Sequence, residues 1–188
     1  RAGGPGASVW RAGIVSGEGG VSWRMVRQLA ARLPVMVTPR WVDTKCQPIY
    51  VDDAVDYLVG VLAAPETVGE TYEIGGPDVL TYREMLRRTR ETIGGHLLVV
   101  PVPVLTPKLS SRWVGLVTDV PATIVRPLVD GLRNPVVVRD DSIRDHVAPD
   151  LTPFDEAVRR ALAARAGRTR RVDAPSAAAD GDTSEGVD

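Results

Sequence analysis

The spacing of apolar residues divides the first half of the chain into short strands and amphipathic helices. Alternating or continuous apolar runs predict strands over residues 9–15, 35–38, 46–51 and 70–75. Helical spacing predicts helices over residues 21–33, from about residue 54 to 62, and from Tyr82 onward; a glycine-containing loop at 16–20 precedes the first. Strands that alternate with helices indicate an α/β domain with a parallel sheet.

The second half has a more helical pattern. The sequence predicts a strand at residues 97–100, helical stretches at 107–117 and 122–132, and an extended run at 136–139. A last helix is expected from Pro153, with Thr152 as its N-cap, to about residue 166. Residues 167–188 lack core-forming periodicity, so we expect a disordered tail there.

Two adjacent carboxylates, Asp52 and Asp53, lie where the strand pattern changes to a helical one. This position predicts Asp52 as the N-cap of the helix and Asp53 in its first turn, where a negative charge favours the helix dipole. A catalytic acid/base pair would need a nucleophile or a metal-ligand set, and the neighbouring residues offer none. Further along, Thr81 and Glu84 have the spacing of a capping box for the helix that begins near Tyr82.

Composition indicates a soluble globular protein with room for one ordinary domain. The 188 residues are 44% apolar, and the mean hydropathy is −0.04. The apolar run at 97–105 contains prolines and is shorter than the ~20 residues of a membrane span, so we expect a cytoplasmic protein without one. A formal net charge of −1 gives no overall electrostatic attraction for nucleic acid.

Few residues have the chemistry of a metal or nucleophilic site. Cys46 is the only cysteine and falls in an apolar strand, which predicts a buried, reduced thiol. His96 and His146 are far apart and lack the spacing of a zinc site, so no metal is expected. Arginines of the first helix are expected on a solvated face, with a phosphate-binding patch as the alternative; they are Arg24, Arg27 and Arg32.

Three blocks in order resemble the C-terminal half of the extended and atypical short-chain dehydrogenase/reductases, over roughly residues 9–163. They are "WRAGIVSGEG", "QPIYVDDAVDYLVGVL" and "YEIGGPDVLTYREML". The superfamily often has an Arg-Pro-Gly run in the first block; here Ala12 replaces the proline and Gly13 is kept. The run from "VPVPVLTP" through "WVGLVTDVPATIVRPLVDGLRNPVVVRD" narrows the likeness to reductases resembling the NAD(P)-binding 39-kilodalton subunit of respiratory complex I.

The departures from this family concern its cofactor and catalytic motifs. No G-x-G-x-x-G or G-x-x-G-x-x-G follows a strand, so the loop that would hold the pyrophosphate is missing. The Tyr-x-x-x-Lys pair is also missing, since Leu86 stands four residues after Tyr82. With Arg1 in place of an initial methionine and no secretion signal, we expect a piece of a longer protein.

The resemblance implies a C-terminal part of a Rossmann-like parallel sheet over residues 1–96 and a mostly helical lid subdomain over 97–166, without the N-terminal dinucleotide-binding half. NAD(P) is then expected in the complete protein, and weak or no binding by this chain alone. The strand beside the nicotinamide ring would be formed by Ala12, Gly13, Ile14 and Val15, with Gly17 turning the loop away. Simple turn chemistry also accounts for these glycines.

The lid and the edge of the cleft supply the expected substrate-binding residues. These are Arg40, Trp41, Lys108, Arg112 and Trp113, with Ser110 and Ser111 as further polar candidates. The alternatives are surface or capping roles for the two serines, and simple packing for Trp41 at the strand edge. No catalytic residue is assigned within the chain.

Two classes of function follow from these observations. One is a partial NAD(P)-dependent oxidoreductase-like protein, inactive alone. The other is a non-catalytic NAD(P)-binding or assembly protein. The expected partners are an unidentified small-molecule substrate and either the missing N-terminal half or a second copy of the chain.

Overall fold

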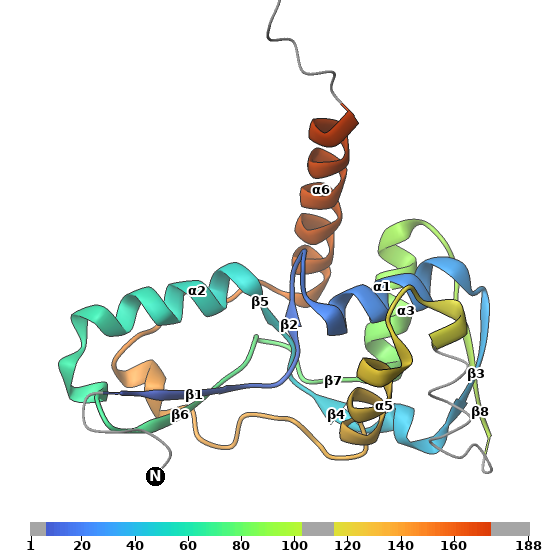
Figure 1. The fold of residues 1–188 in the computed structure, drawn as a ribbon. Coiled ribbons are helices and arrows are strands. Elements are labelled where there is room, and N and C mark those ends of the chain that lie inside the picture. Colours follow the sequence, from blue (N-terminus) through green and yellow to red (C-terminus); the bar gives the residue numbers. More distant parts are fainter. Residues whose placement is uncertain (1–6, 103–114, 174–188) are drawn as a thin grey trace, which may run out of the picture.

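Pairs of short strands, mostly parallel, and the helices between them form the body of the molecule (Figure 1). The structure is a computed structural model that describes residues 7–102 and 115–173. Three pairs are parallel: β1 (Val9–Ala12) with β6 (Thr71–Ile74), β2 (Val15–Ser16) with β5 (Ile49–Tyr50), and β3 (Val35–Pro39) with β8 (Leu98–Val102). The fourth pair, β4 (Lys45–Cys46) with β7 (Leu80–Thr81), is antiparallel.

The mixed α/β class predicted from the sequence is therefore confirmed, with a difference in the sheet. Within the described ranges the strands form separate two-stranded ladders, and the single run predicted over residues 46–51 is divided into β4 and β5. Pro48 lies between these two strands and has no backbone N–H to donate to a ladder. Likewise, the predicted strand over residues 9–15 is interrupted between β1 and β2.

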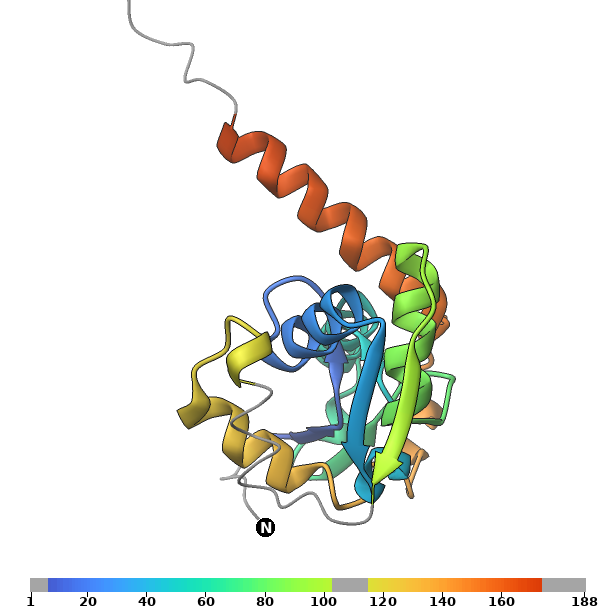
Figure 2. The same cartoon turned by 90° about the vertical axis from the view of Figure 1, so that its right-hand side faces the viewer.

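Helices pack around these ladders, and the last helix projects from the body (Figures 1 and 2). Three-residue and four-residue 3-10 turns join several of the elements. The helices are α1 (Val21–Arg32), α2 (Val51–Gly60), α3 (Tyr82–Ile93), α5 (Ala122–Gly131) and α6 (Phe154–Asp173). The 3-10 turns are η1 (Arg40–Asp43), η2 (Val61–Ala63), η3 (Pro65–Thr67) and η4 (Ser142–Asp145). Of the predicted helix at 107–117, residues 115–117 are helical and the rest lies outside the described residues.

Helix α3 begins and ends as its local sequence dictates. The Thr81 hydroxyl accepts from the Glu84 backbone N–H at 3.2 Å, and a Glu84 carboxylate oxygen accepts from the Thr81 backbone N–H at 2.7 Å. This reciprocal pair is the predicted capping box, and it satisfies two donors that a helix start otherwise leaves unpaired. At the other end, Gly94 adopts a left-handed conformation with φ +98°, which a residue without a Cβ tolerates.

The predicted N-cap of α2 is wrong. Tyr50 is the N-cap residue, with no side-chain capping bond, and Asp52 lies in the first turn together with Asp53. The Asp53 carboxylate, only 3% exposed, accepts hydrogen bonds from the backbone N–H and the hydroxyl of Thr152, each at 2.7 Å. A partner 99 positions away in the sequence, invisible to local patterns, thus fixes this end of the helix.

The predicted start of the last helix is nearly correct, but its capping residue and its end are not. Helix α6 begins at Phe154, whose backbone N–H donates to Asp78 at 2.8 Å, while the Thr152 hydroxyl is bound to Asp53 instead. The helix continues to Asp173, seven residues beyond the predicted end at 166. Arginine, which occurs three times among residues 167–173, has a high helix propensity and favours this continuation.

Two hydrophobic clusters stabilise the body. The larger joins α1, α3, α5 and the start of α6, and the smaller lies between α2, β6 and η4. Cys46 is fully buried in the larger cluster, where its thiol donates to the Leu80 carbonyl at 3.4 Å, as expected for an inert reduced thiol. Across the ranges 7–102 and 115–173, no helix combines the length and the apolar composition needed to cross a bilayer.

Candidate functional site

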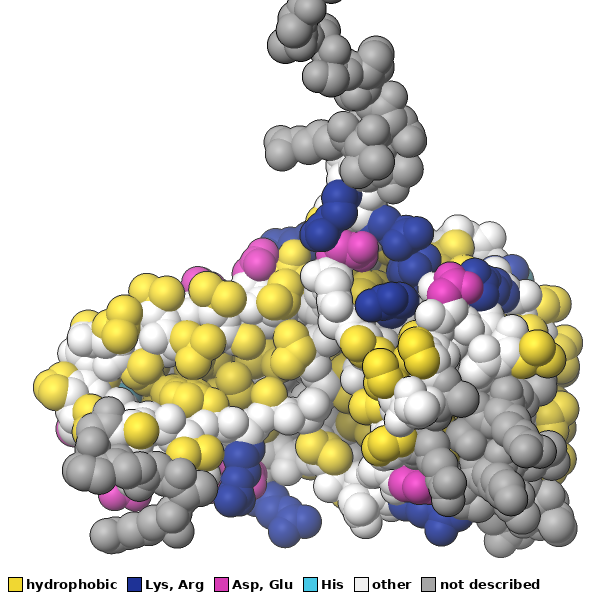
Figure 3. Space-filling model, in the orientation of Figure 1, with side chains coloured by type: hydrophobic (Ala, Val, Ile, Leu, Met, Phe, Trp, Pro, Cys, Tyr) yellow, Lys and Arg dark blue, Asp and Glu magenta, His cyan; other side chains and the backbone are white. Residues whose placement is uncertain are grey.

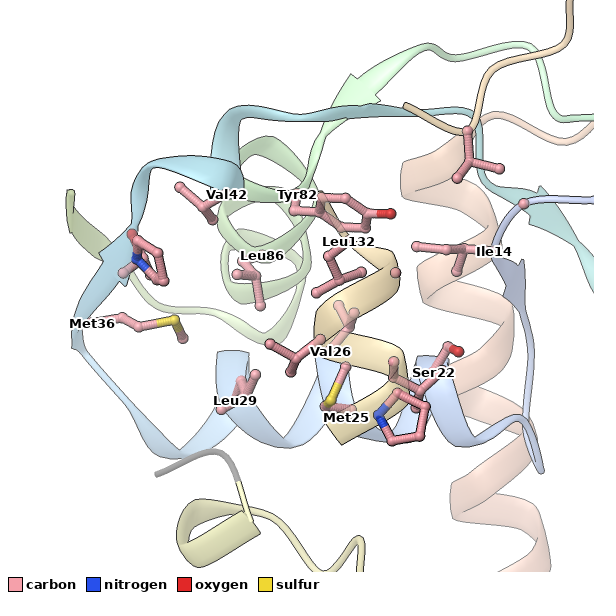
Figure 4. Close-up of a pocket in the computed structure, with 18 of the residues that line it drawn as sticks. Ile14, Ser22, Met25, Val26, Leu29, Met36, Val42, Tyr82, Leu86 and Leu132 are labelled. Atoms are coloured by element: carbon pink, nitrogen blue, oxygen red, sulfur yellow. The ribbon is translucent and has the colours of Figure 1, made fainter. Parts of the chain in front are cut away.

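A cavity of about 250 Å³ opens between α1, β3, α3 and α5 (Figure 4). Its described lining contains no Lys, Arg, His, Asp or Glu, and most of it is aliphatic. The lining residues are Gly13, Ile14, Ser22, Met25, Val26, Leu29, Met36, Val37, Thr38, Pro39, Val42, Tyr82, Leu86, Pro127, Leu128, Val129, Gly131, Leu132 and Val136. A concave, mainly apolar space with a few polar groups is the usual form of a small-molecule site.

Helical spacing directs the apolar side chains toward this space. In α1, Met25, Val26 and Leu29 share one face and are 5%, 6% and 6% exposed. Leu132, which directly follows α5, points toward them from the opposite wall (Figure 4). Because the walls come from elements far apart in the sequence, the cavity exists only in the folded chain.

Strand β3 adds a hydroxyl to this lining. Its residues alternate between exposed and buried, so Met36 and Thr38 share the inward face on which the Met36 side chain reaches the cavity (Figure 4). Thr38 is 5% exposed, and its Oγ1 finds no hydrogen-bond partner among the described residues. A buried hydroxyl without a partner costs free energy, and a ligand can supply the missing bond.

Tyr82 contributes a phenol at the start of α3. Its side chain is 5% exposed, and burial, with a smaller effect from Cys46, raises its pKa well above the ordinary value. The phenol therefore keeps its proton at neutral pH, as a hydrogen-bond donor rather than a base. The described lining offers no lysine that would lower this pKa.

The structure brings together only part of the predicted cofactor-side strand. Gly13 and Ile14 line the cavity, and a Cβ at Gly13 would lie 2.9 Å from Val136 Cγ1, so this position requires glycine or a shift of Val136. Ala12 and Val15 are not among the lining residues: Ala12 ends β1, and Val15 pairs with Ile49 in the β2–β5 ladder.

Gly17 is placed by packing against the start of α2. A Cβ there would collide with the Val51 side chain, so the close approach of the β2 loop to this helix requires glycine. Gly17 does not line the cavity. A role in cofactor binding for Gly17, as for Ala12 to Val15, stays a prediction.

The predicted substrate-binding residues are placed only in part. Lys108, Arg112 and Trp113 lie outside the described residues, as do Ser110 and Ser111. Arg40 and Trp41 begin η1, whose next residue, Val42, lines the cavity, but only their backbone is described. Their role in substrate binding stays a prediction, and the cavity adds walls from α1 and α5 that sequence reasoning did not assign.

The arginines of α1 border a separate polar hollow. Arg27 lines it beside Arg24, and burial followed by the nearby Arg165 lowers the pKa of Arg27. Acidic groups lie among them: Arg165 pairs with Glu18 at 3.7 Å, and Asp119 pairs with Arg32 at 3.1 Å. These ion pairs are typical of a solvated face, and the phosphate-binding alternative stays a prediction.

The cavity does not have the groups that a dinucleotide requires. A pyrophosphate needs cations or a glycine-rich turn into a helix N-terminus, and the described lining provides neither. Its apolar walls fit a neutral ligand instead. If NAD(P) belongs to the complete protein, its phosphates have to be held elsewhere.

No family model matches the chain, and no curated protein matches it by sequence. Solved structures do match its fold. The triphenylmethane reductase of Citrobacter sp., complexed with NADP(H), has a TM-score of 0.62 at 17% identity over 84% of this chain and 53% of its own. A nucleoside-diphosphate-sugar epimerase from Staphylococcus aureus gives 0.58 at 13% identity, over 80% and 51%, and RMD from Pseudomonas aeruginosa complexed with NADPH gives 0.54 at 14% identity, over 84% and 46%.

These similarities concern the fold. The chain shares the architecture of reductase- and epimerase-like proteins, two of them solved with NADP(H) or NADPH, in agreement with the resemblance to extended short-chain dehydrogenase/reductases. It spans about half the length of the solved structures it matches. The narrower likeness to the 39-kilodalton complex I subunit stays a prediction, as does the division at residues 96 and 166.

Proposed function

We propose that this chain is the substrate-side part of an NAD(P)-dependent oxidoreductase-like protein and is inactive alone. The observation that carries this proposal is the neutral cavity bordered by Gly13 and Ile14, the residues that the family resemblance places beside the nicotinamide ring. In this arrangement the substrate occupies the cavity, and α5 forms one wall of its lid. The phosphates of the cofactor belong to a part of the protein that this chain does not contain.

An uncovered apolar surface supports the same proposal. Val55, Leu58, Val59 and Leu62 recur at helical spacing along α2 and η2, and they are 48%, 50%, 59% and 85% exposed. Figure 3 shows hydrophobic side chains gathered over α2 and the neighbouring β1. This α2 face would be covered if the chain were joined to a second α/β part.

Titration with NADPH tests the proposal. We expect the 188-residue chain to give no saturable fluorescence change at micromolar cofactor, because the pyrophosphate loop is missing from it. The longer protein, expressed from a gene that also includes the coding sequence upstream of Arg1, should bind NADPH saturably. Micromolar binding by the 188 residues alone, or an upstream sequence without a glycine-rich fingerprint, would contradict the proposal.

The second candidate is a non-catalytic assembly protein, which the exposed α2 face also favours. The two candidates differ in the upstream sequence and in turnover. A Tyr-x-x-x-Lys pair upstream, together with NADPH oxidation in the presence of a carbonyl or dye substrate, identifies the enzyme. Saturable NADPH binding without that pair and without turnover identifies the assembly protein.

A further inference from the structure

The chemistry of the cavity walls restricts the ligand more narrowly than the fold does. The solved proteins that share this fold include a reductase for triphenylmethane compounds and an epimerase for nucleoside-diphosphate sugars, which are ligands of opposite polarity. A nucleoside-diphosphate sugar carries two negative charges that need cations or backbone donors. The described lining has no cation, so burial of that ligand here would leave its charges unpaired.

Size sets a second restriction. An apolar cavity of about 150 Å³ in another protein stays dry and binds benzene. The cavity here is larger, at about 250 Å³, and offers space for a fused two-ring compound. Side chains from α1, from α3 and from the residue after α5 line this space (Figure 4).

Polar groups set the third restriction. The Thr38 hydroxyl is buried and unpartnered among the described residues, and the protonated phenol of Tyr82 and the hydroxyl of Ser22 lie in the same lining. A purely hydrocarbon ligand would leave the Thr38 hydroxyl unpaired. A ligand with one hydroxyl or carbonyl oxygen would restore the hydrogen bond while its rings cover the aliphatic walls.

We propose that the cavity binds an uncharged, mainly apolar ring compound with a single hydroxyl or carbonyl oxygen, which hydrogen-bonds to Thr38. This inference names the substrate class of the proposed function, and it rests on that function only in treating the ligand as a substrate. The binding itself needs only the cavity. It can therefore be measured on this chain without NAD(P).

The probes are 1-naphthol, which has the oxygen, and naphthalene, which does not. We expect saturable calorimetric or fluorescence binding of 1-naphthol by the 188-residue chain, weaker binding of naphthalene, and none of uridine diphosphate. Thr38→Val keeps the shape and removes the hydroxyl. It should weaken 1-naphthol binding roughly three- to tenfold and leave naphthalene binding unchanged or tighter.

Two variants locate the binding. Leu132→Trp fills the cavity and should abolish binding of both naphthalene compounds, whereas Ile124→Trp, at an exposed position of α5 outside the lining, should leave both unchanged. Circular dichroism tests whether each variant is folded. If Leu132→Trp does not fold, the comparison of Thr38→Val with the wild type decides the test. The proposal is overturned if 1-naphthol does not bind, if Thr38→Val affects both probes equally, or if uridine diphosphate binds more tightly.

These results are separable from the proposed function. Failure of 1-naphthol to bind removes the ligand class but does not touch the NADPH titration of the longer product. Failure of that titration removes the oxidoreductase-like role but leaves a ring-binding cavity in this chain.

Discussion

The carboxylate of Asp53 joins the first turn of α2 to the segment before α6. It is 3% exposed, and both of its bonds to Thr152 are 2.7 Å long. A hydrogen bond to a charged group contributes about 1.5–3 kcal/mol to the stability of a folded protein. Removal of one partner also leaves the other partner buried and unpaired. The neighbouring Asp52 lies in the same favourable position near the helix N-terminus, and its other described interaction is with the Tyr50 side chain.

We therefore expect Asp53→Ala to lower the free energy of unfolding by about 2–3 kcal/mol. Asp52→Ala, the matched control, should cost less, about 1 kcal/mol, since the interactions with the helix dipole and with the Tyr50 side chain are lost. Urea unfolding followed by circular dichroism measures both. Equal losses in the two variants would show that the bond to Thr152 contributes nothing.

The capping box of α3 predicts a pH-dependent contribution. Hydrogen bonds from the Thr81 backbone N–H and from its hydroxyl lower the pKa of Glu84. A lowered pKa in the folded state means that this stabilisation is complete above the ordinary pKa of glutamate, about 4.3, and is lost as the pH falls through the folded-state value.

Glu84→Ala should accordingly reduce stability by about 0.5–2 kcal/mol at pH 7 and by less at pH 3. Thermal unfolding at both pH values gives the comparison. Glu91→Ala, which removes an exposed helix ion pair with Arg87 at 3.5 Å, is the control and should cost about 0.2–0.5 kcal/mol. A Glu84→Ala loss that is the same at both pH values would rule out the carboxylate as its source.

Among the secondary-structure elements, α6 packs into the body with its first turns. Phe154, Val158 and Ala161 are 3%, 0% and 1% exposed against the larger hydrophobic cluster, while residues 163–168 are exposed. The first part of this helix thus belongs to the core. Over residues 163–168 one described contact with the body is the ion pair of Arg165 with Glu18 at 3.7 Å.

For α6 we expect Val158→Ala to cost about 2 kcal/mol because it leaves a cavity in the core. Arg168→Ala, at an exposed position of α6, should change the free energy of unfolding by less than about 0.5 kcal/mol. Chemical denaturation of the wild type and the two variants provides the test. A large loss for Arg168→Ala would show that this part of α6 contributes to the body.

Elements whose signals are local could be predicted from the sequence, and contacts between distant segments could not. The start of α3 follows from Thr81 and Glu84, three positions apart. By contrast, the role of Asp53 depends on Thr152, which is 99 positions away in the sequence. Thr38 and Leu132 come together around one cavity only through the fold of the whole chain. Only Gly13 and Ile14 of the predicted site are shown in that cavity.

At the scale of the whole molecule, the α2 face is an exposed apolar surface. Its four exposed residues form one apolar stripe, and such surfaces favour contact with a partner. We expect the 188-residue chain to self-associate when no other part covers the stripe. The sequence analysis likewise expects the missing N-terminal half or a second copy of the chain as a partner.

Val55→Glu with Val59→Lys places a charged pair four positions apart on the stripe and should shift the chain toward the monomer. Light scattering over a range of concentrations measures the shift. Leu116→Glu, which changes an 84% exposed leucine outside α2, is the control and should leave the mass unchanged. A monodisperse monomeric wild type would contradict the proposed role of the stripe.

Because Cys46 is buried, the reactivity of its thiol reports local opening of the core. Desolvation, with a smaller effect from Glu84, raises the pKa of this single thiol to about 12, and its exposure is 0%. A thiol-specific reagent can react only after β4 separates from the Leu80 carbonyl and admits water. The rate of Cys46 modification in native buffer therefore measures how often the core opens, without any engineered label. A ligand that fills the neighbouring cavity would lower this rate.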